Sequence, residues 1–178
     1  KPYLTKDKTI VSLATGITIS QIEEVLGAGM SVYRAMPNTA ADVKESLTCI
    51  CANHAISETN EVTEIFNSVG KSIVIEEGLM EAATVLGACG IAFVLRFIRG
   101  MIQGGIEIGF SAKMATDIVT QTVKGASELL IQNETHPEAE VDKVTTPRGC
   151  TIAGLNEMEH NGFSSALIKG IVTSYEKI

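Results

Sequence analysis

The chain has 178 residues, of which 45% are hydrophobic and 20% charged, a composition typical of globular proteins and not of disordered ones. Its formal net charge is −7, and no cluster of Lys and Arg offsets it, which argues against binding to nucleic-acid phosphates. Only 4% of the residues are aromatic and none is Trp, so we expect no stacking platform for single-stranded bases.

The four cysteines show neither CxxC spacing nor histidines at ligand spacing, so we expect no metal site. Cys49, Cys51, Cys89 and Cys150 instead suit reduced, mostly buried thiols of a cytoplasmic protein. No secretory signal is visible. The uncharged stretch from Ala82 to Leu95 is short for a membrane crossing and predicts a buried core helix, with no membrane partner. The first residue is Lys1 and not Met, and a polar loop leads from it directly into a strand, so we expect that the sequence starts inside a longer protein.

The first 75 or so residues alternate between strand and helix patterns. β-Branched, apolar runs predict four strands, at Thr9–Ala14, Ser31–Met36, Ser46–Asn53 and Lys71–Glu77. Amphipathic segments predict helices over Ile19–Gly27 and Ser57–Gly70, with Ser20 and Ser57 as N-caps and the two glycines at the ends. This alternation predicts a parallel-type α/β sheet that is covered by helices on both faces.

After Glu77 the pattern becomes helical. We expect helices from Leu79 to about Gly104 and from Ser111 to about Asn133, then shorter ones from Thr151 and Ser164. The Ser111 helix carries a stripe with a spacing of four, namely Met114, Ile118, Thr122 and Ala126. The first long helix contains Gly87 and Gly90, and a glycine inside a helix costs about 1 kcal/mol relative to Ala. We take that cost as a sign of close backbone approach and predict an intertwined dimer, with a domain boundary between residues 76 and 77.

Two strand ends are candidates for ligand contact, because open α/β sheets bind ligands outside the carboxyl ends of their strands. "SLATGIT" (Ser12–Thr18) offers Leu13, Ala14 and Thr15, although a strand-to-helix turn needs a glycine in any case. "RAMPNTA" (Arg34–Ala40) offers Asn38, which has a donor and an acceptor, but Asn also simply builds turns. Both alternatives stay open.

The most site-like stretch is "KVTTPRGCT" from Lys143 to Thr151, a turn shaped by Pro147 and Gly149. Its backbone N–H groups and threonine hydroxyls stand at the start of a helix, which makes it a receptor for a carboxylate. The competing interpretation is that Thr151 only N-caps that helix. Glu77, at the end of the last strand, either is solvated or lines a cleft between domains. His136 and His160 suit surface positions and Cys89 a packing role.

Several of these segments occur in one order and spacing, and the chain thereby resembles the pyrroline-5-carboxylate reductase family over essentially its whole length. They are "SLATGIT", "RAMPNT", "ACGIAF", "QTVKGASELL", "HPE", "DKVTTPRGCTIAGLNEME" and "GFSSALIKGI". The resemblance implies an α/β plus all-α protein: residues 1–76 as the C-terminal part of a Rossmann-type domain, and 77–178 as a helical dimerisation and substrate-binding domain. The family's glycine-rich phosphate loop has no counterpart here, which points to the C-terminal two-thirds of such an enzyme.

The resemblance further implies an oxidoreductase that reduces Δ1-pyrroline-5-carboxylate to L-proline with NADPH or NADH, as a homodimer or decamer in the cytoplasm. The positions that match cofactor contacts are Leu13, Ala14, Thr15, Met36, Pro37, Asn38, Glu77 and Lys143. The positions that match the substrate-carboxylate loop are Thr146, Gly149, Cys150 and Thr151. The Thr151 hydroxyl matches a position near the imine nitrogen and is therefore the candidate catalytic group.

Two segments depart from the family pattern. "GACGIAF" (Gly87–Phe93) replaces the usual "SGSGPAY", and "TPRG" replaces "SPGG", so that Arg148 stands where Gly is common. Arg148 either adds positive charge near a carboxylate or points to solvent.

Two other functions are alternatives to the reductase. The first is a truncated, non-catalytic dimerisation fragment. The second is a β-hydroxyacid dehydrogenase, which is disfavoured because that group needs a catalytic lysine on its first interdomain helix and no Lys lies between Lys71 and Lys113.

Overall fold

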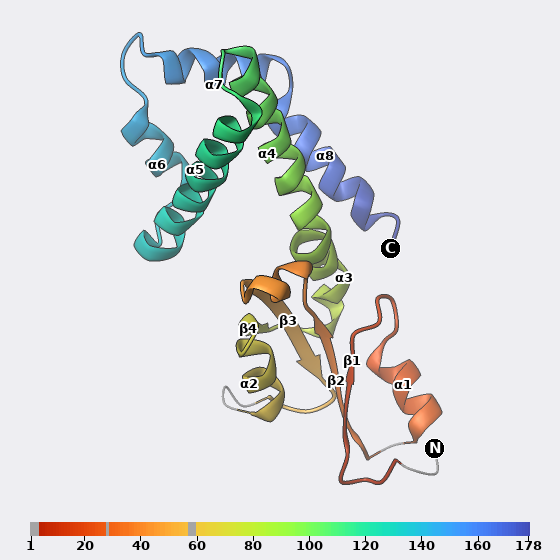
Figure 1. Cartoon of the computed structure of the whole chain (residues 1–178). Helices are drawn as coiled ribbons and strands as arrows, with labels where there is room; N and C mark the ends of the chain where they lie inside the picture. Colours follow the sequence, from red (N-terminus) through yellow and green to blue (C-terminus); the bar gives the residue numbers. More distant parts are fainter. Residues whose placement is uncertain (1–3, 28, 57–59) are drawn as a thin grey trace. The chain divides into compact units, whose positions relative to one another are not determined.

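The computed structural model describes residues 4–27, 29–56 and 60–178 (Figure 1). The chain divides into two compact units, Lys1–Ala92 with Ile171–Ile178, and Phe93–Gly170. The predicted boundary at residue 77 stays a prediction. In the structure Met80, three residues beyond that boundary, is buried in the core of the sheet, so the first turns of the long helix belong to the first unit.

In the part of the chain that the structure describes, the first unit holds one sheet with the strand order β1-β2-β3-β4. Its strands are β1 (Thr9–Ser12), β2 (Ser31–Met36), β3 (Ser46–Ala52) and β4 (Gly70–Val74). The pairs β1–β2 and β3–β4 are parallel, but β2 and β3 are antiparallel, so the prediction of a parallel-type sheet is wrong for the central pair. The reason is the connection, residues 37–45 with the short 3-10 helix η1 (Thr39–Val43), which is too short for a crossover.

Helix α1 (Ile19–Leu26) begins with a capping box at Thr18, not with the predicted cap Ser20. The Thr18 hydroxyl accepts from the Gln21 N–H, and the Gln21 side chain accepts from the Thr18 N–H. The Thr-x-x-Gln spacing that makes this box is visible in the sequence, two residues before the predicted cap. Gly27 ends the helix with a positive φ of 93°, in the role that was expected of it.

Helix α2 (Glu61–Asn67) is shorter than the predicted Ser57–Gly70 segment. Its N-cap is Asn60, whose side-chain oxygen accepts from the N–H groups of Val62 and Thr63. The predicted cap, Ser57, lies outside the described residues.

Helices cover both faces of the sheet, as predicted, and the central strands β2 and β3 are buried on both faces, whereas the edge strands β1 and β4 are half-buried or exposed. One face packs against α1 and the start of the long helix, through a cluster that contains Val32, Met36, Cys49, Cys51 and Met80. The other face packs against α2, through Tyr33, Ala35, Ile50 and Val62.

A continuous helical stretch begins at the end of β4 and covers the predicted Leu79–Gly104 segment. It consists of η2 (Glu77–Leu79), α3 (Met80–Ala83), a π-helical segment η3 (Thr84–Cys89) and α4 (Gly90–Glu107). Length and apolar composition alone would allow this helix to cross a membrane, although such a match is weak evidence. The segment Ala82–Leu95 was predicted to be a buried core helix. In a single chain this is wrong for the residues after Val85, since Leu86, Val94 and Leu95 are exposed.

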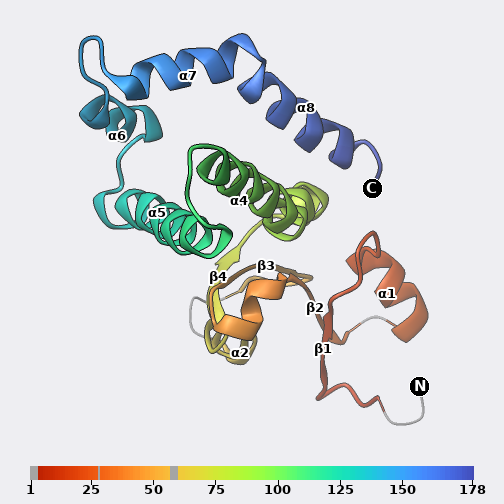
Figure 2. The same ribbon diagram turned by 45° about the horizontal axis from the view of Figure 1, so that its top comes forward.

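The second unit is helical and has a small core. Figure 2 shows α4 beside α5 (Ala112–Asn133), and the buried residues between them are Ile102, Ala115 and Val119. Gly105 lies so close to Ala115 that an added Cβ would stand 3.1 Å from the alanine Cβ. The glycines from which close approach was predicted show no such contact within one chain: an added Cβ would meet nothing within 4 Å at Gly87, and only the Val85 carbonyl at 3.7 Å at Gly90. Much of the remaining apolar surface is exposed, including Met114 and Ile118 of the predicted stripe on α5.

Three shorter helices complete this part of the chain: α6 (Pro137–Val144), α7 (Cys150–His160) and α8 (Phe163–Tyr175). The last two begin one residue before the predicted starts. Sequence reasoning missed α6, although its signals are present: Pro137 at the first helical position, acids in the first turn and Lys143 in the last.

Candidate functional site

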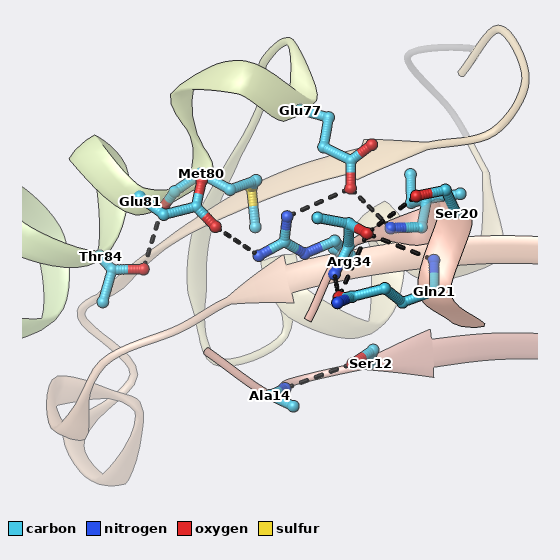
Figure 3. Close-up of polar contacts among 11 residues, drawn as sticks. Ser12, Ala14, Ser20, Gln21, Arg34, Glu77, Met80, Glu81 and Thr84 are labelled. Atoms are coloured by element: carbon cyan, nitrogen blue, oxygen red, sulfur yellow. Dashed lines mark hydrogen bonds and ion pairs between the residues drawn. The ribbon is translucent and has the colours of Figure 1, made fainter. Parts of the chain in front are cut away.

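The two strand ends that were predicted to contact a cofactor lie at the same edge of the sheet. β1 and β2 are parallel and Ser12 pairs with Arg34, so residues 13–15 and 36–38 leave neighbouring strands in the same direction. The segment after β1 is exposed, and the Ala14 N–H donates to Ser12 Oγ at 3.3 Å (Figure 3). Met36 is buried, and Pro37 and Asn38 are half-buried.

Asn38 uses both ends of its amide within the fold. Its Oδ1 accepts from the Ala40 N–H at 3.0 Å and so caps η1, as the turn-building interpretation requires. Its Nδ2 donates to the carbonyl of Gly87, in the π-helical segment, at 3.1 Å. Asn38 therefore shapes the turn and also ties the end of β2 to the long helix.

A buried arginine that sequence reasoning missed organises the same region (Figure 3). The Arg34 side chain is 2% exposed, and its guanidinium lies 3.2 Å from Glu77 Oε1 and 3.0 Å from Glu81 Oε1. Glu77 Oε1 also accepts from the Ile19 N–H, in the first turn of α1, at 2.7 Å. Glu77 is thus half-buried and paired, whereas its neighbour Glu76 is exposed. The sequence offered one signal for this ion pair. Arg34 is the one charged residue of an otherwise mostly apolar strand, and Glu77 and Glu81 stand one helical turn apart at the start of the predicted helix.

Two buried thiols, Cys49 and Cys51, lie beside this network. Burial raises the pKa of Cys49, and burial together with the Glu77 carboxylate raises the pKa of Cys51. The expectation of mostly buried cysteines holds only for these two, because Cys89 is half-buried and Cys150 is exposed. Within residues 4–27, 29–56 and 60–178, no cluster of three or more His, Cys, Asp or Glu side chains is arranged to hold a metal.

The predicted carboxylate loop is a closed turn over Thr146–Gly149. The Gly149 N–H donates to the Thr146 carbonyl at 2.9 Å, Pro147 stands second and Arg148 third with a φ of 60°, as in a type II turn. An added Cβ on Gly149 would lie 2.5 Å from Thr146 Oγ1, so this position needs a glycine. The Arg148 side chain is exposed, in agreement with the solvent-facing alternative.

The turn leads directly into α7, whose N-cap is Gly149. Among the described residues, no side chain caps this helix, and Thr151 is its second residue, so the interpretation that Thr151 N-caps the helix is wrong. The first N–H groups of a helix have no partner inside the helix, and they attract an anion. The turn thus places the Thr146 and Thr151 hydroxyls beside an uncapped helix start.

Lys143 lies in the second unit, near the end of α6, and pairs with Glu140 at 2.7 Å. The hydrogen bonds from Lys143 and from the Thr135 hydroxyl lower the pKa of Glu140. The strand-end residues belong to the first unit. A cofactor contact by Lys143 therefore stays a prediction. Both His136, which caps α6, and His160 are exposed, as expected.

The turn geometry predicts that Arg148→Gly stabilises the protein. A left-handed backbone costs a residue with a Cβ about 1–2 kcal/mol, and the greater freedom of an unfolded glycine offsets part of that gain. We expect the free energy of unfolding in urea to rise by about 0.5–1 kcal/mol. Arg148→Ala is the matched control, because it removes the same side chain but keeps the Cβ. An equal effect of both substitutions would contradict the assignment of strain to the backbone.

We compared the chain with families of known proteins, with curated relatives and with solved structures. The model of the pyrroline-5-carboxylate reductase dimerisation family matches residues 77–178. Pyrroline-5-carboxylate reductase 1 of Dictyostelium discoideum is 50% identical over 190 residues, which cover 99% of this chain and 34% of that protein. Pyrroline-5-carboxylate reductase 2 of the same organism is 49% identical over 193 residues, which cover 99% of this chain and 64% of that protein.

Among solved structures, the pyrroline carboxylate reductase of Plasmodium falciparum with NADP bound superimposes with a TM-score of 0.90 at 32% identity, over 99% of this chain and 72% of that one. The chain thus spans between about a third and two-thirds of the length of the two Dictyostelium relatives. Its sheet is a Rossmann-like fragment and its helices form a dimerisation domain. The chain belongs to the pyrroline-5-carboxylate reductase family.

Proposed function

We propose that this chain is part of an enzyme that reduces Δ1-pyrroline-5-carboxylate to L-proline with NADPH or NADH, the last step of proline biosynthesis. The observation that carries the proposal is the uncapped start of α7, which follows a hydrogen-bonded turn and has Thr146 and Thr151 on either side of it in the sequence. Such a start is a receptor for the substrate's carboxylate. Family membership supplies the matching substrate and reaction.

The residues of the turn bind and orient the substrate. Cys150 and Thr151 offer backbone N–H groups to the carboxylate, and Thr146 offers its hydroxyl. Gly149, whose own N–H is bound to the Thr146 carbonyl, keeps the turn closed. Thr151 donates to the ring nitrogen, or relays a proton toward it, while that nitrogen is an unprotonated imine. A threonine hydroxyl is too weak an acid to protonate an imine alone, so the proton comes from water or arrives with a substrate that is already protonated. The nicotinamide supplies the hydride, and the protein contributes orientation and placement of charge.

The residues at the sheet edge fit one part of the dinucleotide. Leu13–Thr15 and Met36–Asn38 follow adjacent parallel strands, where ligands of open α/β sheets bind, and NADP is bound in the Plasmodium relative. The 178 residues contain no G-x-G-x-x-G sequence, so they supply no pyrophosphate loop of that kind. Glu77 and Lys143 remain the other candidate cofactor contacts.

The second candidate function is a non-catalytic dimerisation fragment. These 178 residues contain no G-x-G-x-x-G sequence, so on their own they would bind the dinucleotide weakly.

The two candidates differ in a steady-state assay of NADPH oxidation with pyrroline-5-carboxylate. It compares this chain with a version that is extended by the upstream segment of the Dictyostelium discoideum reductase 2. Activity of the extended version alone supports the fragment interpretation for this chain. Activity in neither protein would defeat the reductase proposal.

The substrate site is tested in the active protein by Thr151→Val, which removes the hydroxyl and keeps the shape. We expect kcat/KM for pyrroline-5-carboxylate to fall by about a hundredfold, within the usual range for losing a group that assists proton transfer. Thr5→Val, at an exposed position in the N-terminal segment, is the control and should keep the unaltered value. An unchanged kcat/KM in Thr151→Val would rule out Thr151 as the catalytic group.

The protein self-associates in this proposal, as a homodimer that can assemble further into a decamer, in the cytoplasm. A single chain leaves an apolar groove of about 1060 Å³ in the second unit, lined by side chains that include Phe97, Met101, Phe163 and Leu167. Exposed apolar surface of this extent is typical of an interface between subunits. The same contact would cover the apolar helix that by composition alone could cross a membrane.

Sedimentation equilibrium tests the association. We expect a mass of at least twice the 18.9 kDa of the chain, and a shift toward the monomer in Leu167→Glu, which puts a charge into the groove. Thr5→Glu adds the same charge at an exposed position outside the groove and should leave the mass unchanged. A monomeric unaltered chain at micromolar concentration would contradict the proposal.

A further inference from the structure

Among the residues that the structure describes, Arg34 is the one charged residue that is buried, and three elements meet at its guanidinium. Arg34 lies on β2, and its two partners, Glu77 and Glu81, lie one turn apart at the start of the long helix. Each partner binds a different nitrogen, NH1 at 3.2 Å and NH2 at 3.0 Å. One planar cation therefore holds two successive turns of the helix against the strand.

The same network reaches the loop that follows β1. Glu77 Oε1 accepts from the Ile19 N–H, and Ile19 is the first residue of α1, directly after the loop that contains residues 13–15. The second loop, residues 36–38, continues the strand that carries Arg34, and Asn38 Nδ2 binds the Gly87 carbonyl. Both candidate cofactor loops are thus anchored to one helix, and Glu77 is the shared anchor point of Arg34 and α1.

The energetics of this cluster favour a role in geometry over a role in stability. The cost of removing a guanidinium and carboxylates from water offsets much of their attraction, so buried ion pairs add little net stability. In addition, within the described residues, Arg34 Nε is buried without a hydrogen-bond partner, which costs further free energy. An apolar residue would fill this position at lower cost. What an apolar residue lacks is the ability to fix two carboxylates in one orientation.

We propose that Arg34 is a positioning residue for the cofactor site. It holds Glu77, and through Glu77 it fixes the loop of residues 13–15 and the strand end of residues 36–38 relative to each other. The Arg34 side chain is buried, so we assign it a role through Glu77 and not through direct contact with a ligand. This inference rests on the proposed function, because it is the reductase that requires the two loops to present one surface to the dinucleotide.

The test uses the extended reductase with three substitutions. Arg34→Lys keeps the charge but loses the two-pronged contact, Glu81→Gln removes one partner, and Glu24→Gln is the matched control on the exposed side of α1. The measurements are the Kd of NADPH by fluorescence titration and the KM of pyrroline-5-carboxylate at saturating NADPH. Hydrogen exchange of the free protein over residues 13–21 is read alongside, with the α2 peptide as internal reference.

We expect Arg34→Lys to raise the Kd of NADPH about tenfold while the substrate KM changes less than twofold, because only the cofactor loops lose their anchor. Exchange at Ile19 should become faster, and exchange in α2 should not change. Glu81→Gln should raise the Kd about threefold, and Glu24→Gln should change neither constant. If Arg34→Lys does not fold, Glu81→Gln decides the question by the same criteria.

Two results would overturn the inference while leaving the proposed function intact. One is an active, folded Arg34→Lys enzyme with the unaltered Kd for NADPH and unaltered exchange at Ile19. The other is an equal loss of affinity for cofactor and substrate, which a general loosening of the fold would produce. An unaltered extended protein that neither binds NADPH nor reduces the substrate would instead defeat the proposed function, and the inference with it.

Discussion

The contact between the Arg34 guanidinium and the carboxylates of Glu77 and Glu81 determines how the candidate site is built. Side chains of β2 alternate between the faces of the sheet, so Arg34 shares a face with Val32 and Met36 and meets the start of the long helix. A buried cation at that point demands anionic partners, and the helix offers two of them one turn apart. The pairing sets where the strand ends lie relative to that helix, and thereby where a ligand at the sheet edge can bind.

The second unit follows a different constraint, which is a shortage of buried surface. Its three buried apolar residues, Ile102, Ala115 and Val119, are a small core for a bundle of this size. Glycines and alanines let helices approach closely but bury little area themselves. An apolar groove and exposed apolar stripes on the helices stay uncovered in a single chain. The match to a dimerisation family indicates that a second copy of the chain covers them. The open start of α7 lies in this unit, so in the proposed function association and substrate binding would depend on the same helices.

Much of this arrangement could be predicted from the sequence, since apolar periodicity and turn residues report local structure directly. The strands, the cover on both faces, the long helices and the turn around Pro147 follow from such signals. The direction of strand pairing was harder to predict from such local signals. The antiparallel pairing of β2 with β3 follows from the length of the connection between them, and the alternation of strands and helices did not reveal it. The burial and the ion pairs of Arg34 could not be predicted from local patterns, because its partners stand 43 and 47 residues away in the sequence. The predicted N-cap of α7 was wrong because Thr151, although its side chain is of a capping type, stands two positions after the actual N-cap, Gly149.

The central claim is that this chain is part of an enzyme that transfers a hydride from NADPH to pyrroline-5-carboxylate, and the most direct test follows that hydride into the product. The extended protein is incubated with pyrroline-5-carboxylate and NADPH that carries deuterium at the transferable position, and the product is examined by mass spectrometry and NMR. The account predicts L-proline with one deuterium on the ring carbon that was double-bonded to nitrogen. Proline without deuterium, or no proline at all, would contradict it.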